Sequence, residues 1–202
     1  MTDARDGQDP ATARIALLAA AGGAIWRGDW PQLRGLCGAL RSAGWPRSDA
    51  EELLLQAVLF CGFPRVVSAF AELAQAWPAA APPQGGALPA AAQAAAGRAL
   101  FAAIYGDRAA VVEAMLRDCH ADFHAFVFDV AYGRVLARPG LAARDRELLA
   151  AALLAAQDQP RQFISHARGA LRLGASRELL RAAVAGAVGD ADVAAAWCDR
   201  LR

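Results

Sequence analysis

Residues 143–173 read ARDRELLAAALLAAQDQPRQFISHARGALRL, and this stretch predicts two helices joined by a short turn. Alanine and leucine, both strong helix formers, dominate the predicted helix at residues 143–157. The second predicted helix covers residues 160–173, so the connection near Asp158 to Pro160 is only a few residues long. A connection this short favours antiparallel packing of the two helices. The stretch therefore predicts a helical hairpin.

The rest of the chain also predicts helices. No window shows the alternation of β-branched and polar residues that a strand needs. The other predicted helices cover residues 11–27, 29–42, 48–60, 65–77, 90–105, 108–117, 121–137, 176–188 and 191–201. The predicted fold class is all-α, a bundle of helices.

Helix starts are marked by particular residues in the first half. Asp29 is predicted to cap the helix that follows it, because a short polar side chain can accept a hydrogen bond from the first free backbone N–H groups. Ser48 followed by Glu51 has the spacing of a capping box. Pro64 is predicted to lie in the first turn of the next helix, since proline lacks an N–H that the first turn does not need.

One segment divides the chain in two. Residues 78–89, PAAAPPQGGALP, are rich in proline and glycine and fit neither a helix nor a strand. We therefore predict four parts: a disordered tail at 1–10, a helical repeat at 11–77, a linker at 78–89, and a second helical unit at 90–202.

Composition excludes several functional classes. The 21 basic and 20 acidic residues of the 202-residue chain nearly cancel, and neither sign forms a long run, so we expect no binding to nucleic acid or to a membrane. The polar start MTDARDGQDP lacks the layout of a secretory signal, which predicts a cytoplasmic protein. The four cysteines form no CxxC pair and no zinc spacing, so they are predicted to be reduced structural thiols.

Four motifs in the second half resemble those of the carboxymuconolactone decarboxylase family, within the alkylhydroperoxidase-D-like superfamily. In order, they are Ala131-Tyr132-Gly133-Arg134, Arg138-Pro139-Gly140-Leu141, Arg146-Glu147-Leu148-Leu149 and Ser165-His166-Ala167-Arg168-Gly169-Ala170-Leu171. In the first half, Leu59-Phe60-Cys61-Gly62-Phe63-Pro64-Arg65 resembles the turn that closes the family's unit. The resemblance implies a bundle built around a helical hairpin, assembled into trimers or hexamers.

The resemblance also implies one of two chemistries. In the peroxidase-like branch, a glutamate is followed twelve residues later by CxxCxxxH. Counting from Glu147, the corresponding positions here are Gln159, Gln162 and His166. Peroxide reduction needs a thiolate nucleophile and a resolving thiol, and glutamine supplies neither. The decarboxylase branch does not require cysteine, so it remains open.

Glu147 and His166 are therefore the predicted catalytic residues. An imidazole can donate a proton to the carbanion left by decarboxylation, and a carboxylate can stabilise its charged form. Arg146 or Arg168 is predicted to bind the substrate carboxylate through its guanidinium group. The alternative is that His166 only satisfies a buried polar contact and the two arginines are solvated.

The first half resembles the second. Aligned without a gap, residues 14–41 match residues 145–172, including the block GALR at 38–41 and 169–172. This match predicts a degenerate internal duplication. It also sets Ala16 opposite Glu147 and Gly35 opposite His166, so we expect any active site to belong to the second half.

No metal site or cofactor is expected. His120 and His124 are four residues apart near Asp122, which could be half of a metal site. The sequence offers no third ligand, and the more ordinary interpretation is the start of a helix. No glycine-rich phosphate loop is present.

Three functions remain. The first is a carboxy-lyase that acts without a cofactor on a small lactone or related carboxylate. The second is a catalytically silent, homo-oligomeric assembly protein of the same fold. The third is a peroxidase that uses Cys37 or Cys61 in place of the missing pair.

Overall fold

The computed structural model describes residues 9–81 and 85–201, and all regular structure within these ranges is helical. The helices of the first half are α1 (Pro10–Arg27), α2 (Trp30–Ser42) and α3 (Arg47–Ala76). Those of the second half are α4 (Ala90–Tyr105), η1 (Gly106–Arg108), α5 (Ala109–Cys119), α6 (Ala121–Phe126), η2 (Val127–Leu136), α7 (Ala143–Ala156), α8 (Pro160–Arg172), α9 (Arg177–Val188) and α10 (Ala191–Asp199). The all-α prediction is confirmed.

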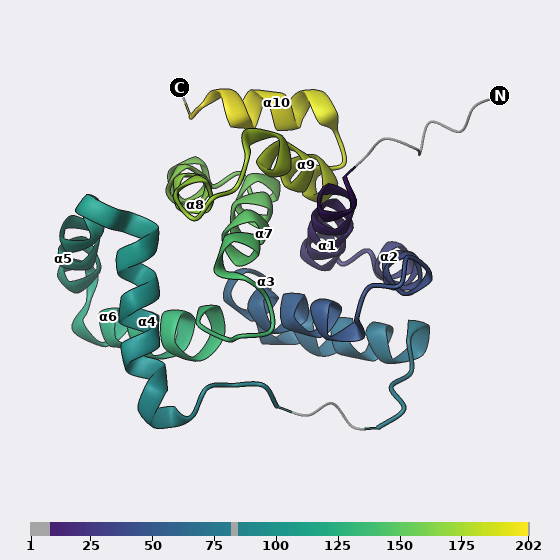
Figure 1. The fold of residues 1–202 in the computed structure, drawn as a ribbon, viewed down its shortest axis with the longest axis horizontal. Coiled ribbons are helices and arrows are strands. Elements are labelled where there is room, and N and C mark those ends of the chain that lie inside the picture. Colours follow the sequence, from purple (N-terminus) through teal and green to yellow (C-terminus); the bar gives the residue numbers. More distant parts are fainter. Residues whose placement is uncertain (1–8, 82–84, 202) are drawn as a thin grey trace.

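Helix α7 lies in the middle of the molecule (Figure 1). Helices α1 to α3 lie on one side of α7 and α4 to α6 on the other (Figure 1). Helices α8 to α10 lie toward the top of the view (Figure 1). The main hydrophobic core draws on α1, α2, α3 and α7 to α10, so both sequence halves contribute to it. A smaller cluster joins α4 to η2 through Phe101, Ile104, Phe128, Tyr132 and Leu136.

The predicted helix starts were right at Asp29 and wrong at Ser48. The Asp29 side chain accepts a hydrogen bond from the backbone N–H of Gln32 at 3.1 Å. Helix α3 instead begins at Arg47, after Pro46, and no side chain caps it. The Glu51 side chain forms an ion pair with the side chain of Arg47, the first residue of α3, and so does not complete a capping box with Ser48.

Helix α3 contains the break that Pro64 predicted. Gly62 has φ 76° and ψ 164°, a backbone conformation that is not helical, and Pro64 follows it. Glycine adopts this positive φ at little steric cost. Helix α3 therefore consists of two helical segments that meet at a kink at Gly62, and they correspond to the two predicted helices at 48–60 and 65–77.

By length and composition alone, α3 is also apolar enough to cross a membrane. One such helix is weak evidence, since core helices of soluble proteins have the same properties. Its first half carries the buried polar residues Asp49, Glu52 and Gln56, which bind partners on α1 and α7. The helix therefore makes the contacts of a core helix.

The predicted tail and linker are only partly described. Helix α1 already begins at Pro10, capped by the side chain of Asp9, and the rest of the predicted tail lies outside the described residues. Residues 78–81 and 85–89 contain no helix or strand, and residues 82–84 of the predicted linker also lie outside the described ranges.

Two contacts agree with an internal duplication. Arg14 and Asp145, which the repeat aligns, form a hydrogen bond of 2.9 Å between α1 and α7. Gly22 and Leu153 are aligned as well, and a Cβ atom built on Gly22 would lie 3.3 Å from Leu153 Cδ2. Aligned positions that face each other would be expected at an axis relating two copies. The duplication itself stays a prediction.

Candidate functional site

The structure brings Glu147 and His166 together. Glu147 lies in the second turn of α7 and His166 in the middle of α8, two helices that pack against each other. His166 Nδ1 is 2.9 Å from Glu147 Oε2, which is hydrogen-bonding distance. The Glu147 side chain is 1% exposed and that of His166 is 14% exposed. The pair is thus almost removed from water, and the imidazole is its more accessible member.

The pair favours a protonated imidazole. Burial by itself would lower the pKa of His166, but the charge of Glu147 and the hydrogen bond to it outweigh burial, so the pKa is raised. Since Nδ1 faces Glu147, Nε2 is the ring nitrogen left to meet a ligand. The ring of Phe60 lies edge-on to this imidazole, with 6.3 Å between the ring centroids. This arrangement provides a proton donor held in one orientation.

Glycine at position 169 makes room for the carboxylate. A Cβ atom at Gly169 would lie 2.6 Å from Glu147 Oε2 and 2.8 Å from Ile104 Cγ2, closer than real Cβ contacts allow. Glu147 Oε1, the other carboxylate oxygen, is buried and has no hydrogen-bond partner among the described residues. A buried acceptor without a partner is costly and often marks a site where a ligand binds.

Gly169→Ala is expected to push Glu147 away from His166. The destabilisation should be about 1–3 kcal/mol, as for other overpacked positions, and the pKa of His166 should fall because the carboxylate no longer supports the imidazolium. Nuclear magnetic resonance titration of the imidazoles and thermal melting measure the two effects.

The control is Gly38→Ala, at the position that the repeat aligns with Gly169. A Cβ atom at Gly38 would meet nothing within 4 Å. This change in the middle of α2 should be neutral or stabilising by about 0.5–1 kcal/mol. An unchanged His166 pKa in Gly169→Ala would show that the glycine does not position the carboxylate.

Two tyrosines that the sequence did not pair are brought together by the fold. Tyr105 ends α4 and Tyr132 lies in η2, and their hydroxyl groups are hydrogen-bonded at 3.1 Å. Tyr132 belongs to the second-half motif quoted above, but nothing in its spacing indicated a partner 27 residues earlier. Only the packing of α4 on η2 joins them.

Arg146 is engaged elsewhere. Its side chain is 1% exposed, and Nη2 donates to Glu52 Oε2 at 2.7 Å and to the carbonyl oxygen of Arg138 at 3.1 Å. Arg138 also binds Glu52, with Nη2 2.7 Å from Oε1. Gln56 donates to the carbonyl oxygen of Arg146 at 2.8 Å. This buried ionic cluster, made of Glu52, Arg138 and Arg146, joins α3 to α7 and favours a structural role for Arg146 over the predicted substrate contact.

A second set of ion pairs joins α1 to α3 and α7. Arg14 Nε donates to Asp49 Oδ2 at 2.7 Å, and Arg14 Nη1 donates to Asp145 Oδ2 at 2.9 Å. Both carboxylates are buried. Three helices, α1, α3 and α7, are therefore held together by charge as well as by apolar packing.

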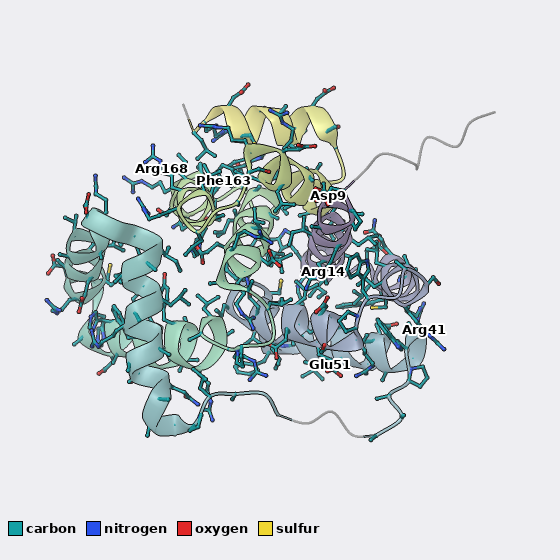
Figure 2. All side chains as sticks on the ribbon, in the orientation of Figure 1. Asp9, Arg14, Arg41, Glu51, Phe163 and Arg168 are labelled. Atoms are coloured by element: carbon teal, nitrogen blue, oxygen red, sulfur yellow. The ribbon has the colours of Figure 1, made fainter. Side chains whose placement is uncertain are left out.

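Arg168, the other predicted carboxylate ligand, lies on the exposed surface of α8 (Figure 2). Within residues 9–81 and 85–201, no hydrogen bond or ion pair involves its guanidinium group. Of the two predicted arginines, Arg168 is therefore the one whose charge is still available to a ligand.

Two hollows on the surface are formed by residues other than Glu147 and His166. One, of about 590 Å³, lies on α5 beside Val111, Met115 and Cys119. The other, of about 430 Å³, is lined by small apolar residues of α4 and of the loop after η2, with Arg138 at its edge. Neither hollow is lined by Glu147 or His166.

Cys37 and Cys61 are poor nucleophiles in this fold. Burial raises the pKa of the Cys37 thiol to about 11, and it raises the pKa of Cys61 to about 11 as well. Gln159 and Gln162, at the positions of the missing thiols, are both exposed. Since the thiolate is the reactive form, neither Cys37 nor Cys61 is activated for attack on peroxide at neutral pH.

The two other histidines have separate partners. His120 Nδ1 accepts a hydrogen bond from the backbone N–H of Asp122 at the start of α6, at 3.1 Å. His124 Nε2 lies 3.2 Å from Glu113 Oε1 on α5. The described residues contain no group of three or more His, Cys, Asp or Glu side chains placed to hold a metal ion.

A comparison with known protein families finds a match over the part of the chain that carries this site. Residues 121–201, which include Tyr132, Glu147 and His166, match the Carboxymuconolactone decarboxylase family. None of the curated proteins compared with the chain matches it.

Proposed function

We propose that this protein decarboxylates a small lactone or related carboxylate without a cofactor, because residues 121–201 match the carboxymuconolactone decarboxylase family. The observation that carries the proposal is the 2.9 Å contact between His166 Nδ1 and the buried Glu147 carboxylate. An imidazolium held in this way is a general acid with a defined direction, since Nε2 is left to face the substrate.

The proposed reaction needs a proton at carbon. The bond between the substrate and its carboxylate group breaks, carbon dioxide leaves, and the electron pair stays on the substrate as an enolate. His166 then donates its proton to the carbanion carbon, which restores the carbonyl group. Glu147 stabilises the imidazolium before the transfer, and solvent returns the proton afterwards. Arg168 is proposed to attract the carboxylate of the incoming substrate.

The test is the release of carbon dioxide from carboxymuconolactone by the purified protein, with no metal or cofactor added. We expect turnover that is proportional to protein concentration and that His166→Ala lowers by about 10²–10⁴-fold. Absence of turnover with carboxymuconolactone and with related small lactone carboxylates would contradict the proposal.

A second candidate is a silent assembly protein of the same fold. It is favoured by the lining of the two hollows described above, because neither is lined by Glu147 or His166. In that case the pair would only hold α7 against α8. Exposed apolar side chains on α5 and α6, namely Val111, Met115, Phe123 and Phe126, are a surface that another copy could cover. Sedimentation tests the proposed trimer or hexamer under either candidate.

Peroxide consumption is expected to be negligible. The positions of the redox thiols hold Gln159 and Gln162, and burial raises the pKa of both Cys37 and Cys61. The measurement is hydrogen peroxide loss in the presence of a dithiol reductant, with Cys37→Ser and Cys61→Ser as controls. Robust activity that either substitution abolishes would show that the chemistry lies at a cysteine.

A further inference from the structure

Phe60 lies in the first half of the chain, two residues before the kink of α3 at Gly62 and outside the residues that match the family. Its ring nevertheless contacts His166 on α8, with 6.3 Å between the two ring centroids and 76° between their planes. Edge contacts at this distance are a favoured arrangement of two flat rings. The first half of the chain therefore reaches the Glu147–His166 pair.

Helix α7 fixes the place of Phe60. The carbonyl oxygen of Phe60 accepts a hydrogen bond of 3.1 Å from Gln157 Nε2, and Gln157 is the residue that caps the end of α7. The Phe60 side chain is also partly buried against the main hydrophobic core. Since Glu147 lies on α7 as well, one helix positions both groups that contact His166.

The two contacts restrict the imidazole in different ways. The hydrogen bond between Nδ1 and Glu147 fixes one ring atom, but it leaves the plane of the imidazole free to turn about that bond. The Phe60 ring, packed edge-on, restricts this turning. A reacting group is held accurately when packing locks its rotamer in addition to its polar contacts. Phe60 therefore fixes the direction in which Nε2 points.

Phe60 also limits the access of water to the imidazole. The His166 side chain is only 14% exposed, and the Phe60 ring beside it offers no atom that could accept a proton. Water in contact with the imidazolium would take up the proton that the substrate needs, and exclusion of water from an active site prevents such losses. An apolar ring at this place therefore suits a proton that must reach carbon.

We propose that Phe60 is a positioning residue of the Glu147–His166 site, so that the site is built from both halves of the chain. The inference rests on the proposed function, because the imidazole needs a fixed direction only if it delivers its proton to a substrate. Phe60 acts through His166: it takes no part in the proton transfer, and its loss lets the imidazole turn and meet water. The alignment of the two halves had assigned any active site to the second half alone.

A second cluster of the same three side-chain types provides a control. His124 Nε2 lies 3.2 Å from Glu113 Oε1, and the ring centroid of Phe128 lies 4.9 Å from that of His124. In the part of the chain that the structure describes, no hydrogen bond or ring contact joins this cluster to the Glu147–His166 pair. Replacing Phe128 therefore changes a ring beside a paired histidine without altering the site.

The first test needs no substrate. The chain contains three histidines, so nuclear magnetic resonance can follow each imidazole separately. An aromatic ring shifts the resonances of the protons next to it, so Phe60→Leu should move the ring resonances of His166 and leave those of His124 unchanged. Phe128→Leu should have the opposite effect. His166 resonances that stay in place in Phe60→Leu would overturn the inference, whatever the turnover.

The second test uses carboxymuconolactone turnover. Phe60→Leu, which keeps an apolar side chain but removes the ring, is expected to lower kcat by about 10²-fold, the cost of misplacing a reacting group by about 1 Å. KM should change little, because the ring acts on the imidazole and not on the substrate. Phe60→Tyr, which keeps the ring, should retain most of the wild-type kcat, and Phe128→Leu should leave kcat unchanged.

Two further variants separate positioning from folding. Phe70, like Phe60, is a phenylalanine of α3 that is partly buried against the main core. Phe70→Leu should lower the melting temperature about as much as Phe60→Leu does, yet leave kcat unchanged. In a protein that already carries His166→Ala, Phe60→Leu should cause no further loss of kcat, because Phe60 acts through His166. Losses that multiply, or an equal loss of kcat in Phe70→Leu, would show a general effect on the fold and overturn the positioning role.

The two proposals fail in different ways. If wild-type protein turns over the lactone and Phe60→Leu is equally fast, the positioning role of Phe60 is overturned while the proposed function stands. If wild-type protein shows no turnover although Phe60→Leu moves the His166 resonances, the proposed function is overturned, and with it the positioning role of Phe60.

Discussion

His166→Ala is expected to lower the turnover of carboxymuconolactone by about 10²–10⁴-fold, the loss typical of a removed general acid. The methyl group cannot supply the proton, and the other two imidazoles, His120 and His124, have partners on α6 and α5. Steady-state measurement of carbon dioxide release at saturating substrate reports kcat directly.

The matched controls separate chemistry from folding. Glu147→Gln keeps the shape of the side chain but removes the charge that supports the imidazolium, so it should also lower kcat. His124→Ala removes an imidazole that is likewise paired with a glutamate, Glu113, yet it should leave kcat unchanged. If His166→Ala leaves turnover unchanged but destabilises the fold by about 1–3 kcal/mol, His166 is a buried structural partner of Glu147.

The same pair sets a pH dependence. The folded-state pKa of His166 is raised, so its stabilising contribution is complete below the unfolded value of about 6.5 and is lost as pH rises through the folded value. Catalysis that needs the imidazolium should decline over the same rise in pH. Glu147→Gln should move both declines to lower pH, which thermal melting and kcat profiles would detect.

Glu52→Gln is expected to destabilise the fold by about 3–5 kcal/mol, the cost of removing one partner from a buried ion pair. Glu52 binds Arg138 and Arg146, whose side chains are 11% and 1% exposed, and the change leaves both positive charges without a counterion. Arg146 Nε is already buried without a partner, which limits the ways in which the cluster can rearrange. Chemical denaturation measures the change.

The control is Glu72→Gln, which removes a surface ion pair with Arg34. The Arg34 side chain is 43% exposed, so this pair should contribute about 0–1 kcal/mol. A loss in Glu52→Gln as small as that in Glu72→Gln would mean that the buried cluster does not hold α3 to α7.

Acid should weaken the same cluster. Burial opposes the charged form of Glu52, but the hydrogen bonds and charges of Arg138 and Arg146 outweigh it, so the pKa of Glu52 is lowered. A lowered pKa gives stability that is present above the unfolded value of about 4.3 and is lost as pH falls through the folded value. The difference in stability between wild type and Glu52→Gln should therefore shrink over that range.

Much of the fold could be predicted because helix boundaries depend on neighbouring residues. The cap at Asp29, the break before Pro64 and the short connection near Pro160 all act within a few residues, and the structure has each of them. The exception is Ser48, because the helix already begins at Arg47, directly after Pro46. When two local signals compete in this way, residue spacing alone does not predict which of them sets the first residue of the helix.

By itself the sequence determined the helical hairpin, the absence of redox thiols at positions 159 and 162, and the candidate pair Glu147 and His166. Only the tertiary structure decided the roles of their neighbours. Consecutive residues on a helix point about 100° apart, so Arg146 faces the buried Glu52 while Glu147 faces His166. Tyr105 and Tyr132 come from separate helices and meet through packing between distant segments. Local periodicity carries no information about which distant segments will pack together, and that packing decides which polar groups share a site.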